Sequence, residues 1–313
     1  MDKKILFAVD GSDQCNQALR TAGDLLKNHD GCQVLLYHCA PELQVFYPGE
    51  MMAPGSMESY LEKAGKAVLE ASQRVLSETG FPADRIAVKL KMESVAPSFD
   101  ILNEAAASKI QTVICGRRGR TPKKNLLIGS TSSRLSQYST MRTVWVIDTP
   151  VHQTRKILIP MEGSPDSRAL TYYATEFFAP IPNLSYKLLH FMPKLPPRFW
   201  DHGRILTDDE KKNTTRELNE WRDGTLREVE KFLSEARDAL IGGGVPPEKV
   251  QTQIVHTNRD LARDMLDEIE RNQYQFVLIG KKGFKEQKPF LIGSNANKIL
   301  KNVKHTILCL VDS

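Results

Sequence analysis

The 313-residue sequence has little of what marks several large classes of protein. Its five cysteines form an odd number with no CxxC pair, so neither a disulfide framework nor a cysteine zinc site is indicated. No apolar run approaches the roughly 18 residues that a membrane-spanning helix requires. The amino terminus enters a strand-like pattern at once and lacks the apolar segment of a signal peptide. We therefore expect a soluble, cytoplasmic protein with reduced thiols and no membrane partner.

The sequence also has only a small excess of charge of one sign. The formal net charge is +5 at pH 7, and lysine and arginine are spread along the chain. This charge gives no ground for predicting nucleic acid as a partner. Hydrophobic residues make up 41% and charged residues 26%, which is ordinary for a globular protein. The length allows two domains, each large enough to bury a core.

An internal repeat organises the chain. Residues 3–13 reappear 152 positions later as residues 155–165, whereas residues 113–120 reappear 164 positions later. The change in displacement indicates one insertion of about twelve residues in the second copy. We therefore predict two related domains, residues 1–150 and residues 151–313.

Strand and helix patterns alternate within each copy. Short apolar runs are typical of buried parallel strands, and the segments between them carry apolar residues at helical spacing. The order β-α-β-α-β-α-β-α-β requires right-handed crossovers and a parallel sheet with helices on both faces. The predicted fold class is α/β, with two tandem doubly wound five-stranded sheets. In the first copy the expected strands are residues 5–9, 33–39, 86–92, 112–115 and 143–147, the expected helices are residues 12–27, 57–76, 99–107 and 130–138, and the second copy repeats this order over residues 156–312.

The fourth strand of each copy leads into the same glycine pattern, G-x2-G-x9-G-S, which ends where a helix begins. Glycine lets the backbone approach a phosphate because it has no Cβ, and a helix N-terminus attracts an anion. In a doubly wound sheet, ligands bind at this carboxyl edge of the strands. The pattern predicts a phosphate-binding loop in each copy; glycines that only shape turns are the alternative. The loops comprise Gly116, Gly119, Gly129 and Ser130 in the first copy and Gly280, Gly283, Gly293 and Ser294 in the second.

Other residues at the ends of the first and second strands are candidates for the same site. Each first strand ends at an acid, Asp10 or Glu162, which can accept hydrogen bonds from ribose hydroxyls or an adenine edge. The alternative is a turn acid that caps the following helix. Cys39 and Phe191 end the second strands, where they either flank a base or belong to the rim of the core.

These residues resemble the universal stress protein family, specifically its ATP-binding branch and its tandem-domain members. The resemblance rests on the starts of both copies, both second strands and both glycine loops, and it covers nearly the whole chain. It implies an adenine-nucleotide-alpha-hydrolase-like fold with one site per domain for ATP, or AMP or ADP, with or without Mg²⁺. By resemblance, the first site comprises Ala8, Val9, Asp10, Cys39, Cys115, Gly116, Gly119, Gly129, Ser130, Thr131 and Ser133, and the second comprises Pro160, Met161, Glu162, Phe191, Ile279, Gly280, Gly283, Gly293, Ser294, Asn295 and Asn297.

The resemblance also implies how the copies meet and where they differ. Residues 142–148 and 306–312, the fifth strands, would pair edge to edge as an internal pseudo-dimer; a homodimer of the whole chain stays open. The second copy departs from the family pattern, because Glu162 replaces the usual aspartate. Met161 and Phe191 are also bulkier than their counterparts in the first copy. We therefore expect two sites of unequal affinity, the first being the stronger.

The implied function is a nucleotide-responsive regulatory protein of the stress response, which alters contacts with an unidentified protein partner. A slow Mg²⁺-dependent ATP hydrolase is the alternative. No catalytic base stands out near the glycine loops, and His38 and His190 lie within second strands, where a core histidine is the favoured interpretation. The HxGH and SGGxDS signatures of adenylating enzymes are absent. The sequence therefore predicts no catalytic residue and no metal ligand.

Two further features leave two interpretations open. The basic pairs at residues 117–118 and 281–282 either neutralise phosphates or are exposed loop charge. The proline-rich insertions at residues 43–57 and 193–213 carry large apolar residues. They form a partner surface or a lid, or they pack onto their own domain.

Overall fold

The computed structural model describes residues 3–41, 54–119, 127–163, 165–192, 208–257, 260–281 and 292–312. The chain folds into two halves with the same order of strands and major helices. The first half contains β1 (Lys3–Ala8), α1 (Asp13–Leu26), β2 (Cys32–Pro41), α3 (Pro54–Glu78), β3 (Ile86–Ser94), α4 (Pro97–Ala107), β4 (Thr112–Gly116), α5 (Ser130–Tyr138) and β5 (Thr143–Ile147). The second half contains β6 (Lys156–Pro160), α6 (Pro165–Tyr173), a π-helical turn η2 (Ala174–Phe178), β7 (Ser185–Met192), α7 (Asp208–Gly242), β8 (Val250–His256), α8 (Leu261–Asn272), β9 (Phe276–Gly280), α9 (Ser294–Asn302) and β10 (Ile307–Val311).

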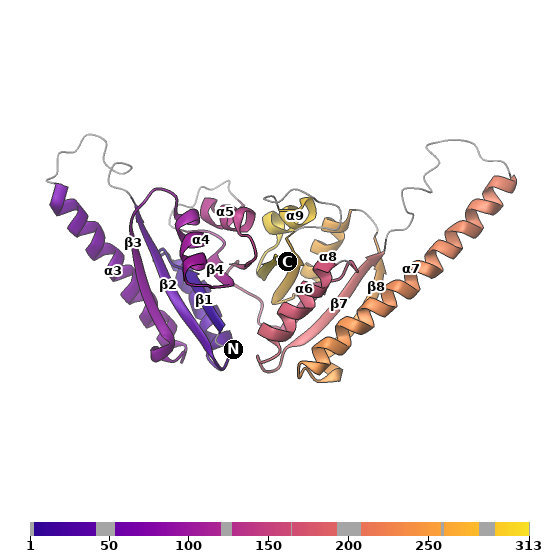
Figure 1. Ribbon diagram of the computed structural model, residues 1–313, viewed down its shortest axis with the longest axis horizontal. Helices are drawn as coiled ribbons and strands as arrows, with labels where there is room; N and C mark the ends of the chain where they lie inside the picture. The colour runs from indigo at the N-terminus through magenta and orange to yellow at the C-terminus, as the bar shows by residue number, and fades with distance from the viewer. Residues whose placement is uncertain are drawn as a thin grey trace.

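The strands of both halves join into one ten-stranded sheet in the order β3-β2-β1-β4-β5-β10-β9-β6-β7-β8 (Figure 1). Adjacent strands within each half are parallel, whereas β5 and β10 pair antiparallel and place Trp145 opposite Cys309. In the first half the chain moves outward from β1 to β3 and then returns to β4 on the other side of β1. The order of connection therefore reverses between β1 and β4, and it does so again between β6 and β9.

Local sequence explains where the helices begin. The side chain of Ser12 caps α1 by accepting a hydrogen bond from the Cys15 N–H at 3.2 Å. Pro97 occupies the first turn of α4, where its fixed φ fits and its missing N–H costs nothing. This proline starts α4 two residues earlier than the apolar periodicity predicts.

Two layers of apolar side chains hold helices on both faces of the sheet. Ile5 and Phe7 point to the face covered by α1, α3, α6 and α7, while Leu6 between them points to the face covered by α4, α5, α8 and α9. This alternation follows from the period of two residues in a strand. Each layer contains buried residues of both halves, so neither core is confined to one copy.

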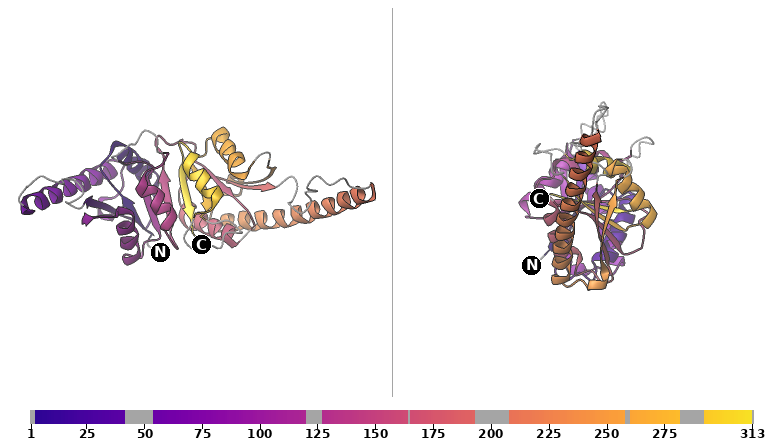
Figure 2. Two further views of the ribbon diagram at one scale, coloured as in Figure 1. Left: turned by 90° about the horizontal axis from the view of Figure 1, so that it is seen from above. Right: turned by 90° about the vertical axis from the view of Figure 1, so that its right-hand side faces the viewer.

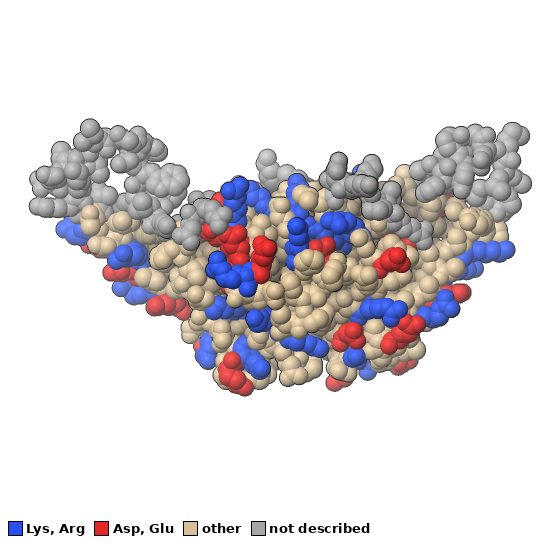
Figure 3. Space-filling model, turned by 180° about the vertical axis from the view of Figure 1, so that it is seen from behind, with Lys and Arg blue, Asp and Glu red and all other residues tan. Residues whose placement is uncertain are grey.

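The sheet twists so that β2 and β7 both run toward the upper side of the view in Figure 1. The carboxyl ends of these strands therefore lie on the same side of the molecule. Seen from above, α3 and α7 extend outward in opposite directions from the central strands (Figure 2). Acidic and basic side chains are interspersed on the face shown in Figure 3, and neither sign dominates it.

The fold expected from the sequence is confirmed: parallel five-stranded sheets are covered by helices on both faces, and the fifth strands pair as an internal pseudo-dimer. The two sheets are continuous across this pair. The π-helical turn η2, which follows α6 directly, has no equivalent in the predicted pattern. Most of both insertions, namely residues 43–53 and 193–207, lies outside the described residues.

Candidate functional site

A cavity of about 350 Å³ lies in the first half at the carboxyl ends of β1, β2 and β4, next to the starts of α4 and α5. Its volume falls within the range of small-molecule sites. Ser133, predicted as a site residue, does not line it; its N–H donates to the Gly129 carbonyl at 2.9 Å within the first turn of α5. The other ten residues predicted for the first site line this cavity: Ala8, Val9, Asp10, Cys39, Cys115, Gly116, Gly119, Gly129, Ser130 and Thr131.

Asp10 occupies the turn between β1 and α1. Its Oδ1 accepts hydrogen bonds from the Ser12 N–H at 3.0 Å and from the Ser12 hydroxyl at 2.7 Å. Its Oδ2 faces Gly119, where the Cβ of any other residue would collide with it. Asp10 therefore holds the turn before α1 through Ser12, the residue that caps this helix, and Asp10 also lines the cavity.

The glycine loop is held by its backbone. The Gly129 N–H donates to the Arg117 carbonyl at 2.9 Å, and a Cβ at Gly129 would lie 3.3 Å from the same oxygen. The Ser132 hydroxyl donates to the Gly116 carbonyl at 2.7 Å. Gly129 is the N-cap of α5 and has no side chain to accept the first N–H groups of this helix. The positive end of α5 therefore borders the cavity and suits an anion.

The cavity also has a less polar wall, to which three thiols contribute. Burial raises the pKa of Cys15, Cys39 and Cys115 to about 12, so these thiols are neutral near pH 7. Thiols with raised pKa values are poor nucleophiles. Pro97 and Ile101 of α4 line the cavity as well. The arrangement combines an anion-binding end, a carboxylate and an apolar wall, which is suited to binding.

Eight lining residues were not predicted as site residues: Cys15, Tyr37, His38, Pro41, Pro97, Ile101, Arg118 and Ser132. Pro97 and Ile101 could have been found, since a helix that follows a parallel strand starts at the carboxyl edge. Ser133 was expected from the family resemblance, and glycine spacing alone does not show that Ser132 is the side chain of the first turn that faces the loop. His38 was predicted as a core residue, and that is confirmed: it is 6% exposed, and its Nδ1 lies 2.7 Å from the Val9 carbonyl.

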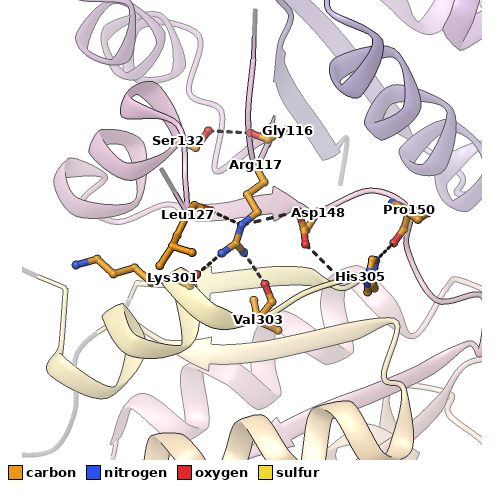
Figure 4. Close-up of polar contacts among 9 residues, drawn as sticks. All are labelled: Gly116, Arg117, Leu127, Ser132, Asp148, Pro150, Lys301, Val303 and His305. Atoms are coloured by element: carbon orange, nitrogen blue, oxygen red, sulfur yellow. Dashed lines mark hydrogen bonds and ion pairs between the residues drawn. The ribbon is translucent and has the colours of Figure 1, made fainter. Parts of the chain in front are cut away.

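The basic residues after Gly116 and Gly280 are buried, so the exposed-charge interpretation is wrong for Arg117 and Lys281. Their exposed fractions are 4% and 1%. Arg117 reaches the carbonyls of Lys301 and Val303 in the second half (Figure 4). Lys281 contacts Ser139 in the first half in the same way. Each of the two cations therefore binds the C-terminal end of a helix in the opposite half. Arg118 is exposed and lines the cavity, whereas Lys282 lies outside the described residues.

The second half repeats the backbone frame of the first site. The Gly293 N–H donates to the Lys281 carbonyl at 2.8 Å, as Gly129 does to Arg117. Gly293 caps α9, on which Ser294, Asn295 and Asn297 lie, and Gly280 ends β9. Of the residues predicted for this site, Gly283 lies outside the described residues.

The side chains around this frame differ from those in the first half. Met161 and Ile279 are buried, Pro160 ends β6, and Phe191 packs against the apolar cluster that contains Ile279. Glu162 is exposed, and its N–H donates to the Ser167 hydroxyl at 3.0 Å. A cavity of about 380 Å³ in this half, between α6 and α7, includes Met161 and none of the predicted glycine-loop residues.

Two further properties of the described residues bear on function. Among them, no group of three or more His, Cys, Asp or Glu side chains is placed to hold a metal ion. Of the described helices, none is both long enough and apolar enough to cross a membrane. His190, also predicted as a core histidine, is only half-buried, and its Nδ1 lies 2.7 Å from the Met161 carbonyl.

Comparison with known proteins assigns the chain to a family. The model of the universal stress protein family matches it twice, over residues 1–147 and residues 153–310. The chain belongs to the universal stress protein family. It carries two family units in tandem, as the internal repeat predicts.

Two curated universal stress proteins are similar in sequence. YxiE of Bacillus subtilis is 29% identical over 147 residues, which cover 45% of this chain and 95% of that protein. A universal stress protein of Mycolicibacterium smegmatis is 30% identical over 175 residues, which cover 54% of this chain and 58% of that protein, so this alignment spans little more than half of the relative.

A solved structure agrees with the tandem arrangement. A universal stress protein from Archaeoglobus fulgidus superposes with a TM-score of 0.64 at 14% identity, covering 100% of this chain and 97% of that one. At this identity the likeness concerns the fold alone, and it extends over both halves.

Proposed function

We propose that the first-half cavity binds an adenine nucleotide, ATP or else AMP or ADP, and that the protein is a nucleotide-responsive regulator. The observation that carries this proposal is that the glycine loop, the start of α5 and Asp10 line one cavity with an apolar wall. Such a combination matches a ligand with an anionic end, a hydroxylated sugar and a flat base. The resemblance to the ATP-binding branch of the family supports the same ligand.

Each part of the nucleotide has a candidate partner. Ser130, Thr131 and the N-terminal amides of α5 would hold phosphate oxygens, and Asp10 would accept hydrogen bonds from the ribose. Cys39 and the start of α4 would flank the base. The residues fit this assignment because Gly119, which has no Cβ, allows the Asp10 carboxylate to lie against the glycine loop.

The second half would be the weaker site. Met161 and Phe191 are larger than Val9 and Cys39, and Phe191 packs against the neighbouring apolar cluster. A bulky side chain in the position of the base leaves less room for it. We treat residues 1–150 and 151–313 as the two nucleotide-binding units and expect the first to fill before the second.

Ser130→Glu tests the first site. The side chain of Ser130 is exposed at the start of α5, so a glutamate there is compatible with the helix but brings a negative charge to the expected phosphate position. We expect the affinity for ATP at the stronger site to fall at least about tenfold, since like charges placed side by side cost more than 1.4 kcal/mol. Isothermal titration calorimetry with and without Mg²⁺ measures the change.

Ser234→Glu is the matched control, because it introduces the same charge on the exposed side of α7. Equal ATP affinities of the two variants would contradict the assignment of the site. Nucleotide released from the purified wild-type protein should be identified in parallel by chromatography. Rapid Mg²⁺-dependent hydrolysis of ATP in the same samples would contradict the proposed regulatory function and support the alternative, an ATP hydrolase.

A further inference from the structure

Arg117 joins the first glycine loop to the far end of a helix in the other half. Its Nη1 donates to the Val303 carbonyl at 2.7 Å and its Nη2 to the Lys301 carbonyl at 2.5 Å, both at the C-terminal end of α9 (Figure 4). Its Nε donates to the Leu127 carbonyl at 2.8 Å and lies 3.8 Å from Asp148 Oδ1. The guanidinium therefore fixes its own loop and the end of α9 at the same time.

Lys281 repeats this contact in the opposite direction. It follows Gly280 as Arg117 follows Gly116, and its Nζ donates to the carbonyl of Ser139, the C-cap of α5. The displacement of 164 residues that relates Arg117 to Lys281 also relates Ser139 to Val303. The two crossing contacts, Arg117 with α9 and Lys281 with α5, are thus equivalent by the internal repeat.

Each crossing residue also holds the start of the helix in its own half. The Arg117 carbonyl accepts the Gly129 N–H at the N-cap of α5, and the Lys281 carbonyl accepts the Gly293 N–H at the N-cap of α9. The backbone of one residue is therefore bonded to one phosphate-binding helix, and its side chain to the other. A movement of either loop changes contacts at both helices.

A second pair of contacts crosses between the halves with the same relation. Asp148 Oδ2 accepts the His305 N–H at 3.1 Å, and Asp312 Oδ2 accepts the Met141 N–H at 2.9 Å. His305 and Met141 lie in the turns that follow α9 and α5, and both have a positive φ near 55°. The C-terminal end of each helix and the turn after it are thus held by two side chains of the opposite half.

Breaking the contacts of Arg117 and Lys281 is unfavourable in free energy. Both are nearly fully buried, and a buried cation that loses its acceptors pays the full penalty of desolvation. A cation also interacts favourably with the negative end of a helix dipole. We propose that Lys281 and Arg117 are positioning residues, each for the phosphate-binding helix of the opposite half, and that they couple the two nucleotide sites. This inference rests on the proposed function.

The test uses full-length protein with one site blocked. Ser294→Glu blocks the second site, and in that background we expect Lys281→Met to weaken ATP binding at the first site roughly five- to twentyfold, within the usual range of coupling between sites. Lys281→Arg should restore most of the affinity, because it keeps a cation at the end of α5. Lys63→Met, which removes the same charge from the exposed surface of α3, is the control.

The outcomes separate this inference from the proposed function. If the Ser294→Glu protein and the wild type bind no ATP, the proposed function fails and the coupling with it. If they bind ATP and Lys281→Met behaves like Lys63→Met, the coupling is overturned while the proposed function stands. In the converse experiment Ser130→Glu blocks the first site, and the effect of Arg117→Met on ATP binding at the second site is measured.

Because Lys281→Met replaces a buried residue and could prevent folding, a second measurement tests the coupling without this substitution. In Ser294→Glu protein, ATP at the first site should slow hydrogen exchange at the end of α9 and in the turn after it, residues 301–305, through Arg117. Protection confined to the first half would overturn the coupling.

Discussion

At the scale of single residues, Gly119 faces a carboxylate oxygen of Asp10 at a place where any side chain would collide with it. Its role is therefore steric and independent of the flexibility of glycine. Gly116 and Gly129 are close to backbone oxygens instead, each at 3.3 Å from the position of a Cβ. A methyl group at Gly119 must displace either the acid or the loop, and both line the cavity.

Gly119→Ala should therefore reduce ATP affinity at the first site by at least about tenfold, or about 1.4 kcal/mol, while the protein remains folded. Titration calorimetry gives the affinity, and thermal unfolding confirms that the fold is retained. Gly224→Ala in α7 is the matched control, because no atom lies within 4 Å of its Cβ. That control should bind ATP as the wild type does and gain up to about 1 kcal/mol of stability from better helix propensity. An affinity of Gly119→Ala equal to that of the control would contradict the steric argument.

At the scale of elements, β5 and β10 form a joint between copies that have diverged. The register places the indole of Trp145 opposite the small side chain of Cys309. Trp145 is fully buried and stacks on Phe178, with ring centroids 5.2 Å apart, and its Nε1 donates to the Tyr173 hydroxyl at 2.9 Å. A large and a small residue share the space that two equal residues would share in a symmetric dimer.

Cys309→Trp should overpack this space and lower the free energy of unfolding by about 1–3 kcal/mol or more. Trp145→Cys should cost about 3–5 kcal/mol through the cavity it leaves. In the double variant the new indole can use the vacated volume, so we expect a loss smaller than the sum of the two. Urea denaturation of the wild type, the two single variants and the double variant gives the interaction free energy between positions 145 and 309. Additive losses of stability would contradict the argument that the two side chains share one space.

The same joint shows what the sequence could and could not predict. The order of strands and helices followed from apolar periodicity, and the pairing of fifth strands followed from the family resemblance. Of the ten predicted residues that line the first-half cavity, six followed from glycine spacing and strand ends, which fix the backbone path around the switch point. The other four, Ala8, Val9, Cys115 and Thr131, followed only from the family resemblance. The direction of Arg117 and Lys281 was not predictable, because a long side chain can reach several places from one backbone position. Their acceptors lie 184 and 142 residues away and come close only through the register of β5 with β10.

At the scale of the whole molecule, the two halves share their interior. Both apolar layers contain residues of both copies, and His29 of the first half lies against Phe177 of the second. The His29 Nε2 is 3.2 Å from the Phe177 carbonyl, and its Nδ1 is 3.0 Å from the Asp30 carbonyl. Because this histidine is 2% exposed, its protonation state matters to the stability of the joined halves.

Burial lowers the pKa of His29 below its usual value of 6.5, and the pKa values of His152 and His190 are lowered by the same cause. The unfolded chain therefore binds protons more readily than the folded one below about pH 6.5, so stability is complete above that pH and falls as the pH decreases toward the folded pKa values. We expect the thermal midpoint to drop between pH 7.5 and pH 5.5, and His29→Gln to reduce the slope of that drop. His256→Gln makes the same substitution at an exposed position on β8, away from the contact between the halves, and is the control. A His29→Gln slope equal to that of the wild type would show that the contact between the halves does not contribute to the pH dependence.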